Sequence, residues 1–183
     1  MNEFIVIIPS RLSSTRLKEK ALLDLKGKSL IERVYLRAIQ SNAAKVFIAT
    51  DSKKIEDHVK NFTSNVILTS VEHVSGTDRV HECASKLDIG DDMVIVNVQG
   101  DEPFINPLTI NKTADIIFKN KNASVGSACT SFNDNDFEDP NNVKVSLSDS
   151  YRAINFSRNV DQTKLSDTKE KYFQHVGIYS YNY

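Results

Sequence analysis

The sequence lacks a long hydrophobic run. No stretch of its 183 residues approaches the roughly 20 consecutive apolar residues that a membrane-spanning helix needs. The first residues also show no basic segment ahead of an apolar core, which a secretory signal peptide would have. We therefore expect no membrane span and no secretion.

An excess of charge and a cysteine framework are also missing. Lys and Arg number 23 against 24 Asp and Glu, so the net charge of −1 gives no whole-surface case for binding nucleic acid or an anionic membrane. Cys83 and Cys129 stand alone, without the spacing of a metal site. We expect both thiols to be buried and reduced, in a cytoplasmic protein.

Two common nucleotide-binding motifs are absent as well. No Gly-x-x-x-x-Gly-Lys and no Gly-x-Gly-x-x-Gly follow the first apolar run at residues 4–8. The hypotheses of a P-loop kinase and of a dinucleotide-dependent dehydrogenase thereby lose their main support.

The first 130 residues alternate short apolar runs with helical patterns. Such alternation predicts an α/β fold with a mostly parallel, Rossmann-like sheet and helices on both faces. After about Thr130 the chain becomes turn-rich and β-like, which predicts a smaller antiparallel β lobe at 131–183 within one domain of 1–183. Expected strands are 4–8, 46–50, 65–68, the apolar segment 93–96, 123–128, 143–147, 153–156 and 173–181.

The segment 97–103 reads as the carboxyl end of a buried strand. Gly100 allows close approach of a ligand, two acids follow it, and Pro103 prevents the strand from continuing. Ligands of open α/β sheets bind outside the carboxyl ends of the strands. Asp101, placed beside a phosphate, is suited to hold Mg²⁺.

The loop at residues 9–20 follows the first strand and is rich in hydroxyl and basic side chains. Arg11, Arg16 and Lys20 recur at intervals of five and four residues. Guanidinium groups and backbone amides at a strand end suit a triphosphate. The alternative is a solvated basic loop, which is what most charge runs are.

The segment 75–79 is predicted to begin a helix. Ser75 or Thr77 can cap the helix, and Gly76 allows close approach of a ligand. Capping does not explain Arg79, because the dipole of a helix disfavours a cation in the first turn. A ligand anion or a base carbonyl nearby would explain it.

Taken together, these segments resemble the 3-deoxy-manno-octulosonate cytidylyltransferases, also called CMP-Kdo synthetases. The resemblance covers residues 4–181 and rests on an ordered set of motifs. They are Pro-x-Arg-x-x-Ser-Thr-Arg-Leu-x-x-Lys at 9–20, Ala-Thr-Asp at 49–51, Ser-Gly-Thr-Asp-Arg at 75–79, the segment 97–103, Phe-Ser-Arg at 156–158 and His-x-Gly-Ile-Tyr at 175–179.

The resemblance implies a role for each matching residue. The CTP phosphates would be bound by Arg11, Ser14, Arg16 and Lys20, the cytidine by Ser75, Arg79 and Gln99, and the sugar acid by Arg158, His175 and Tyr179. Asp101 would be a magnesium ligand, and Lys20, Arg16 and Asp101 would be catalytic. From the residues alone, Arg158 suits a carboxylate, whereas a histidine in an alternating strand, such as His175, is more often structural.

The implied function is transfer of a cytidylyl group from CTP to 3-deoxy-D-manno-octulosonate (Kdo), for lipopolysaccharide biosynthesis. The expected enzyme is a CTP-dependent nucleotidyltransferase that uses Mg²⁺, forms a homodimer through the smaller lobe and binds no nucleic acid. Positioning and charge neutralisation dominate such chemistry.

The chain departs from the family pattern at two places. Lys18 and Glu19 stand where the family usually has Pro-Gly, which places a negative charge beside the expected triphosphate site. The family also continues beyond His-x-Gly-Ile-Tyr to a late Asp that completes the metal site, whereas this sequence ends at Tyr183. Two alternatives therefore stay open: a catalytically incomplete fragment that binds nucleotide or dimerises, and a CMP-sugar synthetase for a related sugar acid.

Overall fold

The computed structural model of the protein describes residues 3–13, 17–90, 92–132, 137–160 and 171–183. The chain divides into two units, which are treated separately. Unit 1 comprises Met1–Ser127 together with Ile178–Tyr183, and unit 2 comprises Ala128–Gly177.

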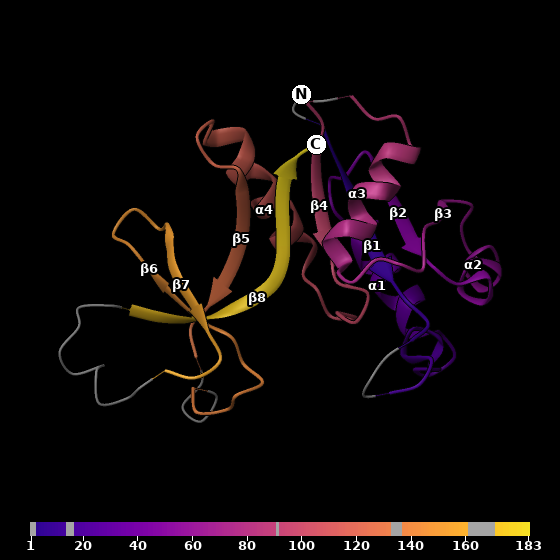
Figure 1. Cartoon of the computed structure of the whole chain (residues 1–183), viewed down its shortest axis with the longest axis horizontal. Coiled ribbons are helices and arrows are strands. Elements are labelled where there is room, and N and C mark those ends of the chain that lie inside the picture. The colour runs from indigo at the N-terminus through magenta and orange to yellow at the C-terminus, as the bar shows by residue number, and fades with distance from the viewer. Residues whose placement is uncertain (1–2, 14–16, 91, 133–136, 161–170) are drawn as a thin grey trace. The chain divides into compact units, whose positions relative to one another are not determined.

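Unit 1 is built on a mixed sheet with a parallel centre, as the apolar runs predict (Figure 1). β1 pairs in parallel with β2 and β4, β2 pairs in parallel with β3, and the last residues of β8 pair antiparallel with β4. The elements with residues in unit 1 are β1 (Phe4–Ser10), η1 (Lys20–Leu22), α1 (Leu30–Ala38), β2 (Lys45–Thr50), α2 (Lys53–Val59), β3 (Val66–Leu68), α3 (Gly76–Lys86), β4 (Val94–Val98), α4 (Pro107–Lys119), β5 (Val125–Thr130) and β8 (Lys171–Asn182).

Three of the helices of unit 1 are capped by serines. Ser29, Ser52 and Ser75 precede α1, α2 and α3, and the side chain of each accepts a hydrogen bond from the backbone N–H three residues later. Such a cap satisfies an N–H group that the helix itself leaves unpaired. Of the two caps that the sequence offered for the helix near Asp78, Ser75 and Thr77, the structure uses Ser75.

The sheet is buried because its central strands are apolar on both faces. All seven residues of β1 are buried, and Ile5 and Ile7 pack against Val80 and Cys83 of α3. Side chains alternate across a strand, so Val6 and Ile8, both fully buried, point to the opposite face. α1 and α4 contact β1 and β4, respectively, and also contact each other.

The parallel register brings three strand ends to one edge of the sheet. Ser10 at the end of β1 is aligned with Thr50 at the end of β2, and Ile7 of β1 is aligned with Asn97 near the end of β4. The segments that follow these strands therefore start from the same edge, where open α/β sheets bind their ligands.

Unit 2 is a smaller antiparallel arrangement, as predicted. β6 (Lys144–Leu147) lies between β7 (Ala153–Ser157) and the first residues of β8. Lys144 is buried and its Nζ donates to the backbone oxygens of Asp139, Asn142 and Arg158 at 2.7, 3.1 and 3.0 Å. These three bonds satisfy a buried ammonium group that would otherwise be costly, and they tie a turn to the end of β7.

Two expectations need correction. The smaller lobe was expected at 131–183, but residues 178–183 belong to unit 1, because the last part of β8 continues the sheet beside β4. Both cysteines were expected to be buried, and Cys129 is exposed while Cys83 lies in the core. Cys129 stands near the exposed end of β5, where Thr130 is exposed as well, and composition alone does not reveal this.

Among the helices of the described residues, none has the length and apolar character that crossing a membrane requires.

Candidate active site

The larger cleft of unit 1 opens at the shared edge of the sheet and has a volume of ≈ 470 Å³. The loop after β1 supplies one side of it and the segment after β4 the other. Its lining residues include Ser10, Arg11, Lys20, Gln99 and Asp101. The structure therefore brings together the loop expected to bind a triphosphate and the segment expected to hold Mg²⁺.

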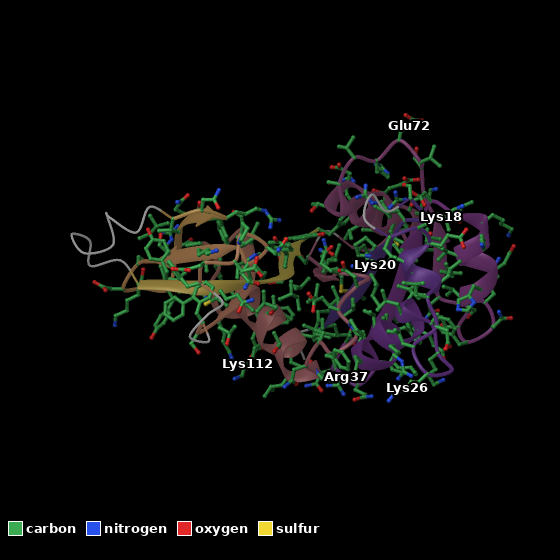
Figure 2. The ribbon with its side chains drawn as sticks, turned by 90° about the horizontal axis from the view of Figure 1, so that it is seen from below. Lys18, Lys20, Lys26, Arg37, Glu72 and Lys112 are labelled. Atoms are coloured by element: carbon green, nitrogen blue, oxygen red, sulfur yellow. The ribbon has the colours of Figure 1, made fainter. Side chains whose placement is uncertain are left out.

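Lys20 and Asp101 form an ion pair in this cleft. The Lys20 Nζ donates to Asp101 Oδ2 at 2.6 Å, and the side chains remain 40% and 46% exposed. Lys20 begins the short helix η1 of unit 1, and its side chain is labelled in Figure 2. Such an exposed ion pair contributes little to stability. A ligand can therefore replace Asp101 as the partner of Lys20, or Lys20 as the partner of Asp101.

Gly100 allows two strand ends to approach closely. A Cβ atom added at Gly100 would lie 2.7 Å from the backbone oxygen of Pro9. The expected reason for this glycine was close approach of a ligand, whereas the structure shows close approach of a neighbouring backbone. The glycine thus sets the distance between the two walls of the cleft.

A smaller cleft of ≈ 170 Å³ shares Pro9, Ser10, Arg11 and Gln99 with the larger one. Its other lining residues come from the loop between β3 and α3 and from the start of α3; they are His73, Val74, Ser75, Gly76 and Arg79. Arg11 and Gln99 therefore face both clefts. The sequence analysis assigned no role to His73, although it stands only two residues before Ser75.

Arg79 is held inside unit 1 by protein groups. It is 3% exposed, and its guanidinium donates to Asp51 Oδ2 at 2.8 Å, to Thr69 Oγ1 at 2.6 Å and to the Ser70 oxygen at 3.2 Å. A cation in the first turn of a helix is thus explained by Asp51, and no ligand anion is needed. That Arg79 also contacts cytidine stays a prediction.

Asp51 connects this arginine with the loop after β1. Its Oδ1 accepts from the Leu12 backbone N–H at 3.2 Å while Oδ2 accepts from Arg79. The sequence analysis included Asp51 in a motif but gave it no role at the site. Ser52, not Asp51, caps α2.

Glu19 adopts a backbone conformation that favours glycine. Its φ is 54°, in the left-handed region. Its side chain pairs with Lys54 of α2 at 2.6 Å, and this hydrogen bond lowers the pKa of the Glu19 carboxyl. The negative charge that departs from the family pattern therefore has a partner on α2.

The groups beside Asp101 fit a magnesium ion only in part. No cluster of three or more His, Cys, Asp and Glu side chains that could hold a metal occurs within the described ranges. Mg²⁺ needs no such cluster, since it is commonly bound by one or two carboxylates and substrate phosphates. Burial raises the pKa of the Glu102 carboxyl, and the charge of Asp101 raises it further. Because a raised pKa makes a carboxylate a poorer metal ligand, Asp101 is the better candidate.

The residues expected to bind the sugar acid fall in both units. Tyr179 lies in unit 1, where it is aligned with Asn97 of β4, and burial raises the pKa of its phenol. Arg158 and His175 lie in unit 2. Arg158 Nη1 donates to the backbone oxygens of Pro140 and Asn141 at 3.2 and 3.1 Å.

His175 packs edge-on against Phe156, with ring centroids 5.0 Å apart, and burial lowers the pKa of its imidazole. This packing agrees with a structural role for His175 in an alternating strand. Sugar binding by His175 stays a prediction. Ser14 and Arg16, expected to bind phosphates, lie outside the described residues.

The fold and the strand-end clefts define the class of protein. A mostly parallel sheet flanked by helices, with clefts at the carboxyl ends of β1 and β4, is a nucleotide-binding α/β arrangement. The family model described as cytidylyltransferase matches residues 5–182. The chain belongs to the cytidylyltransferase family.

Named relatives show which members of the family this chain resembles. The 3-deoxy-manno-octulosonate cytidylyltransferase of Francisella tularensis (strain SCHU S4 / Schu 4) is 41% identical, with 96% of this chain and 73% of that protein covered. The protein of the same name from Haemophilus influenzae (strain PittGG) is 42% identical, with 97% and 74% covered. The solved structure of CMP:2-keto-3-deoxy-manno-octonic acid synthetase complexed with CTP matches with a TM-score of 0.88 at 34% identity, covering 98% of this chain and 74% of that one.

Proposed function

We propose that this chain activates 3-deoxy-D-manno-octulosonate with CTP, giving CMP-Kdo and pyrophosphate. The observation that carries the proposal is the Lys20–Asp101 pair, in which a cation from the segment after β1 and a candidate metal ligand from the segment after β4 face one cleft. The named relatives and the CTP complex of a similar structure support the choice of substrates.

The reaction is an in-line displacement at phosphorus. The anomeric hydroxyl oxygen of the sugar acid forms a bond to the α-phosphorus of CTP, and the bond from that phosphorus to the β-phosphate oxygen breaks. The hydroxyl proton is lost to solvent, and pyrophosphate leaves with the bonding electrons. The protein's task is to position the reactants and neutralise charge.

Lys20 and Arg11 are the described cations best placed for the phosphates, because both line the larger cleft. When CTP binds, Lys20 exchanges Asp101 for a phosphate oxygen, which frees the carboxylate. Asp101 would then hold Mg²⁺ together with the phosphates. The metal would supply charge neutralisation on the phosphate oxygens and a lower pKa for the attacking hydroxyl.

The smaller cleft is the proposed site of the cytidine. Gln99 and Ser75 line it and carry the polar groups that can read a pyrimidine edge. Arg158, His175 and Tyr179 are the proposed sugar-acid residues. Arg158 is suited to the substrate carboxylate because a guanidinium can bind a carboxylate with two parallel hydrogen bonds.

A homodimer is part of the proposal. β7 is the end of the strand order in unit 2, and its residues Ile154 and Phe156 are exposed. An edge strand with exposed apolar side chains invites pairing with another chain, and a second copy would cover it. Light scattering after size-exclusion chromatography tests this, and a monomer at micromolar concentration would contradict it.

We place the reaction in the cytoplasm, where CTP is available, as a step that supplies activated Kdo for lipopolysaccharide. The test of the function is pyrophosphate release from CTP and Mg²⁺ in the presence of Kdo. Sialic acid and an amino-substituted octulosonate serve as competing substrates. Release with Kdo above the others supports the proposal, whereas release with none of the sugars would refute catalysis by this chain.

A further inference from the structure

The loop between β3 and α3 forms one wall of the smaller cleft. It runs over residues 69–75, and its last residues His73, Val74 and Ser75 line the cleft. Glu72 stands on the part of this loop that projects from unit 1 (Figure 2). The position of the wall therefore depends on what holds the loop.

Apolar packing does not hold the loop. Val71 and Val74 are 69% and 87% exposed, so neither contributes much buried area. A loop with little buried apolar surface opens at low cost unless polar contacts restrain it. The restraint must come from hydrogen bonds.

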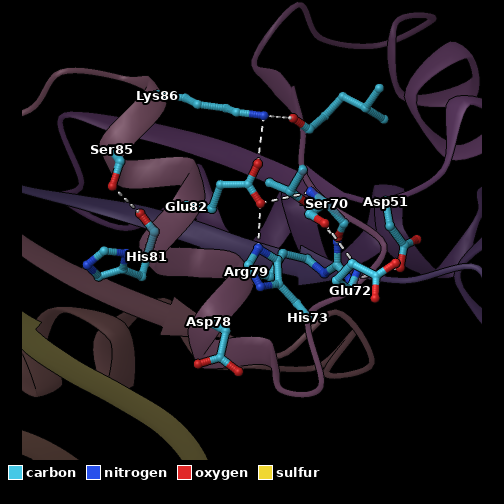
Figure 3. Close-up of polar contacts among 12 residues, drawn as sticks. Asp51, Ser70, Glu72, His73, Asp78, Arg79, His81, Glu82, Ser85 and Lys86 are labelled. Carbon is cyan, nitrogen blue, oxygen red and sulfur yellow. Dashed lines mark hydrogen bonds and ion pairs between the residues drawn. The ribbon is translucent and has the colours of Figure 1, made fainter.

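One carboxylate on α3 supplies several of these bonds (Figure 3). Glu82 Oε2 accepts from the Ser70 backbone N–H at 2.8 Å and also bonds His73 Nε2. Glu82 Oε1 pairs with Lys86 Nζ at 2.7 Å. Lys86 in turn donates to the Leu68 oxygen at 2.8 Å.

Arg79, one turn earlier on α3, completes the hold on Ser70. Its Nη1 donates to the Ser70 oxygen, so both backbone polar groups of Ser70 are bound by α3 side chains. Glu82 is not among the residues that line either cleft. It reaches the cleft only through His73 and the loop.

The charge of Glu82 is maintained by its partners. Burial alone would raise the pKa of its carboxyl, but hydrogen bonds from Lys86, the Ser70 backbone and His73 outweigh burial and lower the pKa to about 2. The carboxylate is therefore ionised at neutral pH. Bonds to a charged acceptor are roughly twice as strong as neutral ones.

We propose that Glu82 is a positioning residue for nucleotide binding, which fixes His73 and the loop 69–75 as the wall of the base-side cleft without touching the nucleotide. This inference rests on the proposed function, because it takes the smaller cleft as the cytidine site. The larger cleft, which lacks this loop, binds the phosphates independently of Glu82.

The two clefts allow a test that distinguishes a displaced loop from a general loss of stability. Dissociation constants of CTP and of inorganic tripolyphosphate are measured by calorimetry for the wild type, Glu82→Gln and Glu82→Ala. We expect Glu82→Ala to weaken CTP on the order of tenfold, because a displaced binding group has effects of this size or larger. Glu82→Gln should lie between the two, since it keeps an oxygen for the Ser70 N–H. Tripolyphosphate affinity should not change.

Glu56→Gln is the matched control. Glu56 is a helix glutamate paired with Lys53 and Lys60 in the same manner, but it lies on α2 and lines neither cleft. Kinetics add a second readout: KM for CTP should rise in Glu82→Ala while kcat at saturation stays the same.

Thermal melting of each ligand-free variant shows whether it is folded. If Glu82→Ala is not folded, the test uses the milder Glu82→Gln. CTP affinity within twofold of the wild type in both Glu82 variants would overturn the inference. An equal loss of CTP and tripolyphosphate affinity would overturn it as well. Failure of the wild type to bind CTP would instead refute the proposed function.

Discussion

The Lys20 ammonium nitrogen lies 2.6 Å from Asp101 Oδ2, although 81 positions separate the two residues in the chain. The parallel register of β1 and β4 makes this contact, because it brings the loop after one strand to the acid after the other. Two groups proposed for CTP and Mg²⁺ are thus held together, each neutralising the other, before any ligand arrives.

Lys20→Ala and Asp101→Asn should each lower pyrophosphate release by about 10²–10³ and leave the fold intact, because each removes a group aimed at the reacting phosphates. The rate is measured with CTP, Mg²⁺ and Kdo. The free energy of unfolding, measured in urea, should change by less than about 1 kcal/mol, as expected for an exposed ion pair.

The exchanged double variant Lys20→Asp with Asp101→Lys separates pairing from function. It restores the ion pair with the charges reversed, so it should fold and remain inactive. Recovery of activity in this variant would show that the pair matters only structurally.

Asp51→Asn and Arg79→Lys should each lower the free energy of unfolding by about 3–5 kcal/mol, since each breaks or distorts a buried ion pair. Lys cannot replace Arg79, whose guanidinium reaches Asp51, Thr69 and Ser70 from one planar group. Urea denaturation measures the effect. Asp57→Asn is the control, because Asp57 is exposed and its pair with Lys53 is on the surface.

Gly100→Ala should destabilise the protein by about 1–3 kcal/mol, because a methyl group would force the ends of β1 and β4 apart. Activity should fall as well, since the widened strand ends carry both walls of the larger cleft. Gly90→Ala makes a matched control, as a Cβ there meets nothing within 4 Å. Equal stability of the two variants would show that the contact with Pro9 is relaxed at no cost.

The stabilisation by Glu82 should depend on acid pH. Its pKa is about 2 in the folded chain against an ordinary value of 4.5, so its contribution is complete above pH 4.5 and is lost as the pH falls towards 2. The difference in unfolding free energy between the wild type and Glu82→Gln should shrink over this range. A difference that stays constant down to pH 2 would contradict the low pKa.

The two cysteines should react differently with a thiol reagent. Cys129 is exposed, whereas Cys83 is buried and burial raises the pKa of its thiol to about 12. At mildly alkaline pH the folded chain should be modified at Cys129 alone, and both thiols should react after unfolding in urea. Cys129→Ser should abolish the reaction of the folded chain, and rapid modification of this variant would mean that Cys83 is accessible.

Local features of the fold follow from the sequence because they depend on neighbouring residues. The apolar runs predict β1, β2 and β4, and the segment that starts at Ser75 predicts where α3 begins. The parallel centre of the sheet follows from the alternation of strands and helices. The strands and the helix start are each settled within a window of a dozen residues, and the parallel arrangement by their order along the chain.

Contacts between distant segments do not follow in this way. Arg79 needed a partner, and the sequence analysis expected a ligand, but Asp51 lies 28 positions away and only the sheet register brings it near. The return of residues 178–183 to unit 1 was missed for the same reason. The role of Glu82 depends on a loop whose fold no periodicity describes.

β8 serves both units, with its first residues beside β6 and its last beside β4. This imposes an order of events during synthesis. The free edge of β4 is translated early and stays without its antiparallel neighbour until nearly 80 further residues, including those of unit 2, have left the ribosome. Pairings between such distant segments are slow to form. The edge of β4 is therefore exposed to unwanted pairing with other chains until β8 has been synthesised.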